Sequence, residues 1–307
     1  MKSNIKWKVD GQTIVGGNGY GDKLNQLRYP RGIYVDDEEQ CIYIADTWNH
    51  RIVKWKLDGG NDHGEIVAGG NGKGNTIDQL NFPTGVILDE KKKSLIICDF
   101  GNKRVVRWSL QNPNGDKEIL IENIKCWGLM MNENGDLFVS DWNEHAVKRW
   151  RKGEIKKGKE GRIVAGGNGK GNKLNQLNNP TYIFIDGEET IYVSDRLNHR
   201  VMKWLKGASE GIVVAGGQGQ GNSLKQLYSP EGLVVNEVGD IYVADWGSHR
   251  IMCWLLGLKE GRVVVDGNGE GKGSNQLTYP FGLSFDVENN LYVADWYNHR
   301  IQRFGIN

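Results

Sequence analysis

Apolar residues recur along the chain in short runs that alternate with polar turns. One unit has the runs Ile33 to Val35, Ile42 to Ala45, Ile52 to Trp55 and Ile66 to Ala68. Runs rich in Val, Ile, Tyr and Phe that are bounded by Gly, Pro, Asn and Asp predict β-strands and turns. No window of 11 or more residues shows a convincing helical period. We therefore predict an all-β protein with four short strands in each unit.

A six-residue tag follows the second run of each unit and sets the period. Its six copies read DTWNHR, DFGNKR, DWNEHA, DRLNHR, DWGSHR and DWYNHR, and they begin at Asp46, Asp99, Asp141, Asp195, Asp245 and Asp295. The steps between copies are 53, 42, 54, 50 and 50 residues, a self-similarity typical of propellers, solenoids and arrays. Six units of four strands predict a six-bladed β-propeller.

The two ends of the chain argue against a solenoid, which needs atypical polar caps. The last unit stops after its third strand, at Arg300 to Phe304, and residues 12–17 supply the missing fourth strand. We therefore expect one propeller domain over residues 1–307, closed by the N-terminal strand. The blades are expected at about 30–70, 83–124, 127–167, 180–217, 230–267, and 280–307 with 12–17.

The repeated P-x-G, Y-V-A-D and N-H-R motifs resemble those of the NHL-repeat family, although Arg51 stands where the family name has Leu. The resemblance covers nearly the whole chain and implies the propeller fold. It implies no single function, because NHL propellers include RNA binders, protein-docking modules, extracellular sensor domains and an amidating lyase.

A Gly/Asn-rich loop joins most units, as in GGNGKGNTIDQL from Gly69. It lacks a following helix and a Lys-Ser/Thr pair, so we interpret it as a structural turn, not a phosphate loop, with the Leu of its Gln-Leu pair filling the space between blades. The loop is missing after Ile124, and Ala146 stands where other tags have Arg. The resulting lower rim beside blade 3 either admits a partner or reflects harmless drift.

Charge and cysteine content restrict the possible partners. Lys plus Arg number 39 against 38 acidic residues, so the net charge of +1 gives no global attraction to nucleic acid or acidic membranes. Cys41, Cys98, Cys126 and Cys253 form no C-x-x-C pair, and the three that lie on predicted strands are interpreted as buried small apolar residues. With no secretory segment, sequon or membrane-length apolar run, we expect a soluble protein with reduced thiols and no membrane partner. The compartment and the oligomeric state stay open, with an intracellular location and a monomer favoured. Basic stretches such as Lys91 to Lys93 and Arg151 to Lys157 are expected to be solvated turns.

Residues repeated in every blade are expected to serve the fold. The tag histidines cannot converge on a metal, because sheets pack about 10 Å apart and a zinc–nitrogen bond is about 2 Å. We expect each tag Asp and Arg to form a charge-assisted hydrogen bond or to cap the turn. The aromatic stripe of Trp55, Trp108, Trp150, Trp204, Trp254 and Phe304 is expected to pack between blades.

Positions that repeat in space but vary in residue type carry the functional signal. The middle residue of P-x-G gives Arg31, Thr84, Trp127, Thr181, Glu231 and Phe281, and the residue after the tag Asp gives Thr47, Phe100, Trp142, Arg196, Trp246 and Trp296. Trp48, Tyr182 and Tyr297 add further aromatic side chains. Aromatic residues and Arg are enriched at binding hot spots, and a concave mouth is the default site. We predict that this aromatic face binds a ligand; the alternative is that the rings only close the pore.

Three functions remain open at this point. The first is a non-catalytic scaffold that docks a protein or peptide on the aromatic face, without a cofactor. The second is single-stranded RNA binding on the same face, through stacking and through Arg31 and Arg196. The third is a metal-dependent lyase or hydrolase in the pore, although only Glu231 stands out as a candidate acidic residue and no metal-ligand set can be assembled.

Overall fold

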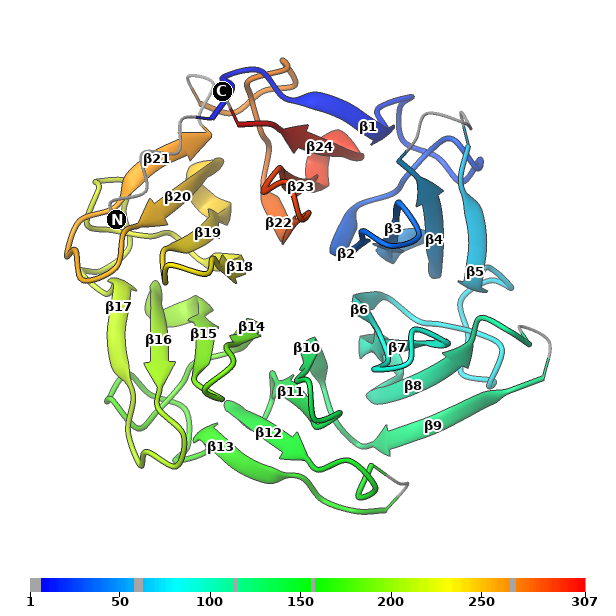
Figure 1. Ribbon diagram of the computed structural model, residues 1–307, viewed down its shortest axis with the longest axis horizontal. Coiled ribbons are helices and arrows are strands. Elements are labelled where there is room, and N and C mark those ends of the chain that lie inside the picture. The colour runs from blue at the N-terminus through cyan, green and yellow to red at the C-terminus, as the bar shows by residue number, and fades with distance from the viewer. Residues whose placement is uncertain (1–6, 58–62, 113–114, 156–157, 266–268, 307) are drawn as a thin grey trace.

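The computed structural model describes residues 7–57, 63–112, 115–155, 158–265 and 269–306. Six four-stranded antiparallel sheets form a closed ring around a central axis (Figure 1). The predicted all-β, six-bladed propeller is confirmed. Three parts of the sequence predictions lie outside the described residues. They are the start of the fifth glycine loop at 266–268, the expected ends of blades 5 and 6 at 267 and 307, and Lys156 and Lys157 of the basic stretch.

The strands of each blade run outward from the axis in chain order. Blade 1 has β2 (Pro30–Asp36), β3 (Cys41–Asp46), β4 (Arg51–Lys56) and β5 (Glu65–Gly69); blade 2 has β6 (Pro83–Leu88), β7 (Ser94–Asp99), β8 (Arg104–Ser109) and β9 (Lys117–Glu122). Blade 3 has β10 (Cys126–Met131), β11 (Leu137–Asp141), β12 (Ala146–Trp150) and β13 (Arg162–Gly166); blade 4 has β14 (Pro180–Ile185), β15 (Ile191–Asp195), β16 (Arg200–Trp204) and β17 (Ile212–Gly216). Blade 5 has β18 (Pro230–Val235), β19 (Ile241–Asp245), β20 (Arg250–Trp254) and β21 (Arg262–Val265); blade 6 has β22 (Pro280–Phe285), β23 (Leu291–Asp295), β24 (Arg300–Phe304) and β1 (Gln12–Gly16).

The N-terminal strand closes the ring as the sequence predicts. β1 pairs antiparallel with β24, with Gln12 opposite Arg303 and Gly16 opposite Arg300. In Figure 1, β1 lies outside β24, while β2, β6, β10, β14, β18 and β22 surround the centre. The blade that combines β1 with the last three strands therefore has the same four-strand sheet as the others.

The apolar core lies between neighbouring blades, because each sheet buries both of its faces against the next sheets in the ring. One cluster combines Ile97 and Trp108 of blade 2 with Tyr43 and Ile52 of blade 1. The aromatic stripe expected to pack between blades is confirmed, since its six members are at most 7% exposed.

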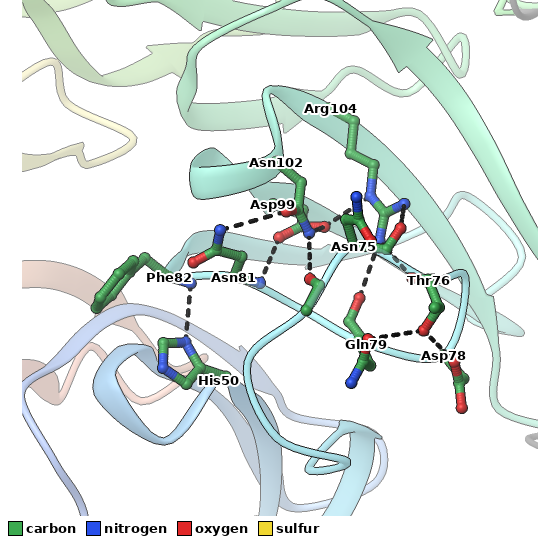
Figure 2. Close-up of polar contacts among 11 residues, drawn as sticks. His50, Asn75, Thr76, Asp78, Gln79, Asn81, Phe82, Asp99, Asn102 and Arg104 are labelled. Carbon is green, nitrogen blue, oxygen red and sulfur yellow. Dashed lines mark hydrogen bonds and ion pairs between the residues drawn. The ribbon is translucent and has the colours of Figure 1, made fainter.

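The tag residues hold the loop that leads into their own blade. In blade 2, Asp99 accepts hydrogen bonds from the Asn81 backbone N–H, Asn102 Nδ2 and Arg104 Nε, each at 2.7 Å (Figure 2). Arg104 also donates to the carbonyls of Asn75, Thr76 and Gln79 in the loop, at 2.9 to 3.0 Å. The predicted Asp–Arg charge-assisted hydrogen bond is confirmed, and its further role is to satisfy loop carbonyls.

The tag histidines bind the loop that leaves their blade. His50 Nδ1 accepts the backbone N–H of Phe82, the residue before β6, at 3.1 Å (Figure 2). His145, His199, His249 and His299 make the equivalent bond to the next blade at 3.0 to 3.2 Å. Burial is the largest cause of a lowered pKa in all five, which favours the neutral, accepting imidazole.

The glycine loops are structural, and their Leu residues fill the space between blades as expected. Leu27, Leu80, Leu177, Leu227 and Leu277 are at most 1% exposed. Gly69, which ends β5 at a φ of 70°, illustrates why glycine is needed, because a Cβ there would lie 2.5 Å from the His50 carbonyl oxygen.

The junction between blades 2 and 3 differs from the rest. Only residues 123–125 separate β9 from β10, and Cys98 of β7 forms a disulfide with Cys126 of β10 across the junction. The prediction of reduced thiols is therefore wrong for this pair, while Cys41 and Cys253 are free and buried. The two cysteines are 28 residues apart in sequence, but neighbouring blades bring their Cα atoms to 5.3 Å.

Candidate functional site

The middle residues of the P-x-G turns line the pore where the innermost strands begin. These strands approach so closely that a Cβ on Gly32 would lie 2.6 Å from the Thr84 carbonyl oxygen of the next blade. Thr84 and Thr181 are fully buried, and Thr84 Oγ1 donates to the Trp127 carbonyl at 2.8 Å. The threonines of this ring therefore connect blades and offer no surface to a ligand.

Glu231 lies at the centre of a polar cluster in the pore. It is the second residue of β18 and has no exposed surface. Its Oε2 accepts a hydrogen bond from Trp127 Nε1 at 3.2 Å, and its Oε1 forms an ion pair with Arg196 Nε at 2.6 Å. Burial raises the pKa of Glu231 to about 7, against the opposing effects of Arg196 and Arg31. One buried carboxylate from blade 5 thereby joins blades 3 and 4.

Arg31 enters the same cluster from blade 1. Its guanidinium carbon lies 4.7 Å from the ring centre of Trp127 and 5.0 Å from that of Phe281, a cation–π arrangement. Arg196 is held similarly, 5.7 Å from Trp142 and 5.3 Å from Trp246. The pore mouth therefore has two guanidinium groups in an aromatic cage and one carboxylate.

Tyr182 narrows the pore because it replaces the glycine of the P-x-G turn in blade 4. Its hydroxyl donates to the Thr84 carbonyl of blade 2 at 3.3 Å, past the intervening blade 3. Burial, and secondarily the charge of Glu231, raise the pKa of Tyr182 and keep the phenol protonated. This side chain therefore connects two blades that are not neighbours in the ring.

The structure brings most of the predicted site residues into one pore cluster, but it does not leave all of them on an open surface. An ion pair between Arg196 and Glu231 lies inside this cluster. The other residues that belong to it or pack against it are Arg31, Phe100, Trp127, Trp142, Tyr182, Trp246, Phe281 and Trp296. Four of the predicted residues, Thr47, Trp127, Glu231 and Phe281, are at most 6% exposed because the innermost strands pack tightly around the axis. Thr47 donates to the Pro83 carbonyl instead of facing a ligand.

Trp48 belongs to a second feature, which the sequence interpretation missed. Tyr20, Tyr29, Trp48, Phe82 and Tyr297 form a chain of ring contacts over blades 6, 1 and 2, which we call the aromatic arc. Centroid distances along it are 5.3 to 6.2 Å, and Tyr29 also contacts Trp296 of the pore mouth at 4.4 Å. Tyr20, Trp48 and Tyr297 are 49%, 38% and 51% exposed.

The arc is asymmetric around the ring. Positions equivalent to Trp48 and Tyr297 hold Gly101, Asn143, Leu197 and Gly247, and the positions of Tyr29 and Phe82 hold Asn179 and Ser229 in blades 4 and 5. Arg28 lies 4.5 Å from the Tyr20 ring centre and 5.7 Å from that of Trp48, and Lys73 Nζ lies 5.0 Å from that of Phe82. The signal for the arc in the sequence is the aromatic residue before Pro30, Pro83 and Pro280, which blades 4 and 5 lack.

Within the described ranges, no group of three or more His, Cys, Asp or Glu residues is placed to hold a metal ion. No helix in the part of the chain that the structure describes has the length and apolar character needed to cross a bilayer.

Comparison with known proteins identifies the repeat. The NHL-repeat family model matches residues 27–55, 227–254 and 277–304, which are parts of blades 1, 5 and 6. No curated protein sequence matches the chain.

Solved structures share the fold at low identity. An auxiliary nutrient binding protein of Bacteroides thetaiotaomicron is 15% identical, with a TM-score of 0.73 over 99% of this chain and 77% of that one. A gluconolactonase of Xanthomonas campestris is 12% identical, with a TM-score of 0.66 over 100% and 99%. Virginiamycin B lyase of Staphylococcus aureus is 12% identical, with a TM-score of 0.59 over 99% and 100%. These likenesses concern the fold alone: three stretches of the chain match the NHL-repeat model, and its six blades form a β-propeller.

Proposed function

We propose that the protein is a non-catalytic scaffold that docks a protein or peptide on the aromatic arc. The observation that carries this proposal is the asymmetry of the arc. Side chains that repeat in every blade hold the fold, whereas Tyr20, Trp48 and Tyr297 are exposed on one side of the ring and have no aromatic equivalents on the other.

The chemistry of the arc suits a peptide ligand. Trp and Tyr supply large contact areas at a small cost in side-chain entropy, and both are enriched at binding hot spots. Ring contacts within the arc limit the motion of Trp48 and Tyr29 before a ligand arrives, which lowers the entropy lost on binding. The arc also continues through Trp296 into the pore mouth, so one ligand can contact both.

Single-stranded RNA is the alternative ligand, favoured by the cations over the arc. Bases can stack on aromatic rings while Arg28 and Lys73 neutralise phosphates. The overall net charge of +1 argues against a binding mode dominated by phosphate contacts.

Selection from a displayed random-peptide library tests the proposal. Peptides enriched on the wild-type protein should bind the Trp48→Ala/Tyr297→Ala variant about 30-fold more weakly or worse, because truncating a hot-spot residue costs about 2 kcal/mol or more. Leu197→Ala is the matched control, since Leu197 occupies the equivalent position in blade 4 and is 39% exposed. Equal binding to the arc variant and the control would refute arc docking. Binding of single-stranded oligonucleotides with a steep salt dependence would favour the RNA alternative.

A further inference from the structure

Arg31 differs from every arginine that holds the fold together. A structural arginine such as Arg51 donates through Nε, NH1 and NH2 to a carboxylate and three carbonyls, at 2.7 to 3.1 Å. The guanidinium of Arg31 instead lies over the faces of Trp127 and Phe281, where it also interacts with the charge of Glu231. Its Nε is buried without a hydrogen-bond acceptor, and no ion pair to it exists among the residues that the structure describes. A buried donor without an acceptor is costly, which points to a partner from outside the chain.

Two further donors beside Arg31 lack acceptors. Trp246 Nε1 and Trp296 Nε1 are buried and unpaired. Their rings flank Phe281, at centroid distances of 6.4 and 5.6 Å, and Arg31 lies over the same phenyl ring at 5.0 Å. Guanidinium and indole N–H groups can only donate hydrogen bonds. The complementary ligand group is therefore an acceptor, and the charge of Arg31 favours an anion.

The neighbouring pair shows which anion the pore accommodates. The Glu231 carboxylate is held by Arg196 and by an indole N–H, that of Trp127, at 2.6 and 3.2 Å. Arg31 with the indoles of Trp246 and Trp296 repeats this combination of one guanidinium and indole donors, but without a carboxylate. Two guanidinium groups against one carboxylate also leave excess positive charge in an apolar cage, where electrostatic attraction is strong.

We propose that Arg31, Trp246 and Trp296 form a carboxylate-binding subsite in the pore mouth, beside the Glu231–Arg196 ion pair. The carboxylate comes from a free organic acid or from the C-terminus of a peptide. The Arg196 side chain, which lies against the Trp246 ring beside this subsite, is 20% exposed. The subsite does not depend on the aromatic arc, and either can fail alone.

Titration with acetate, followed by NMR of the tryptophan indole N–H signals, tests the subsite directly. We expect acetate to shift the Trp246 and Trp296 signals, assigned with the Trp246→Phe and Trp296→Phe variants, and neutral acetamide to leave them unchanged. Equal shifts with acetamide, or shifts with inorganic phosphate but not acetate, would overturn the proposal. Triglycine compared with its C-terminal amide distinguishes the sources, because a peptide terminus gives shifts only in the free acid.

Two substitutions should change acetate affinity in opposite directions. Arg31→Met keeps the aliphatic packing but should weaken binding by at least about tenfold, as expected for the loss of charge-assisted hydrogen bonds. Glu231→Gln keeps an acceptor for Trp127 Nε1 and should strengthen binding several-fold, because it removes the competing internal carboxylate. Unchanged affinity in Arg31→Met, or weaker binding in Glu231→Gln, would contradict the assignment. If Arg31→Met does not fold, the comparison of acetate with acetamide on the wild-type protein still decides.

Discussion

Four blade junctions have a thirteen-residue connection and the junction between blades 5 and 6 spans residues 266–279, whereas the junction between blades 2 and 3 has three residues, 123–125. At the junctions with a long loop, the tag His of the blade before the loop and the tag Arg of the blade after it both form hydrogen bonds to the loop backbone. At the short junction, the tag of blade 2 has Lys103 in place of His, and the tag of blade 3 has Ala146 in place of Arg. Both substitutions fall on the two residues whose partners the missing loop would supply.

This comparison changes the interpretation of the irregular blade. Drift would substitute tag residues without regard to their partners, but here blade 2 retains Arg104 and blade 3 retains His145, each of which still has a loop to hold. The short junction is stabilised by other means: the Cys98–Cys126 disulfide, the buried side chain of Ile124, and a Lys148–Asp141 ion pair at 2.9 Å. The junction is therefore a coherent variant of the repeat.

The strongest test of this comparison removes the tag Arg from blade 2 and introduces an Arg at the same tag position of blade 3. Arg104→Ala should lower the free energy of unfolding by about 3 to 5 kcal/mol, because it leaves the buried Asp99 carboxylate without its counter-ion and three loop carbonyls without a donor. Ala146→Arg should give no stabilisation, because the short connection before blade 3 has no loop carbonyls that the new guanidinium could bind. Urea unfolding of both variants measures the difference, and a gain in stability from Ala146→Arg would show that the loop is not the reason for the loss.

The disulfide should matter next. Replacing both Cys98 and Cys126 by Ala should cost about 2 to 4 kcal/mol, the usual contribution of a disulfide, and reductant should lower the melting temperature of the wild type but not of the double variant. Mass spectrometry after alkylation without reductant should find two reactive thiols in the unfolded protein. Four alkylated thiols would contradict the pairing.

Acid should weaken the loop-bearing junctions selectively. Burial, with Lys73 and Arg28, lowers the pKa of His50 from its ordinary value of 6.5. A histidine with a lowered folded-state pKa binds fewer protons when folded, so its stabilising contribution is complete above its unfolded pKa and is lost as the pH falls through about 6.5. Protonation also removes the Nδ1 acceptor of the Phe82 N–H.

His50→Asn isolates this contribution. The Asn side-chain oxygen can accept the same bond, and Asn tolerates the φ of 53° at this position. We expect a change within about 1 kcal/mol at pH 8 and a smaller loss of stability on acidification than in the wild type. Lys103→Asn, at the short junction, is the control and should leave the pH dependence unchanged; a similar pH effect in both variants would exclude the junction bond as its source.

The sequence was sufficient for the fold because the period, strand pattern and ring closure are all local signals. It also indicated the pore residues, since Arg31, Arg196 and Glu231 vary at positions that repeat. It could not show that Trp127 and Phe281 are buried, because the distance between innermost strands depends on how six blades close. The sequence also could not show the Cys98–Cys126 disulfide, because the pairing depends on which strands of neighbouring blades face each other. Nor could it connect Lys103 with the missing loop, because that requires knowing which loop each tag contacts.

The smallest expected effect gives the most specific test of that link. Lys103→His restores the common tag in blade 2, but only residues 123–125 lead into β10, in place of the thirteen-residue loop from which the Phe82 N–H donates to His50 Nδ1. The stability should therefore stay within about 0.5 kcal/mol of the wild type, as for a surface substitution. His50→Lys, the reverse exchange at a loop-bearing junction, should lower the free energy of unfolding by about 1 kcal/mol because the partly buried Phe82 N–H loses its acceptor. Equal effects in the two variants would mean that the histidine does not serve the loop, and the two tag substitutions would then be independent of the missing connection.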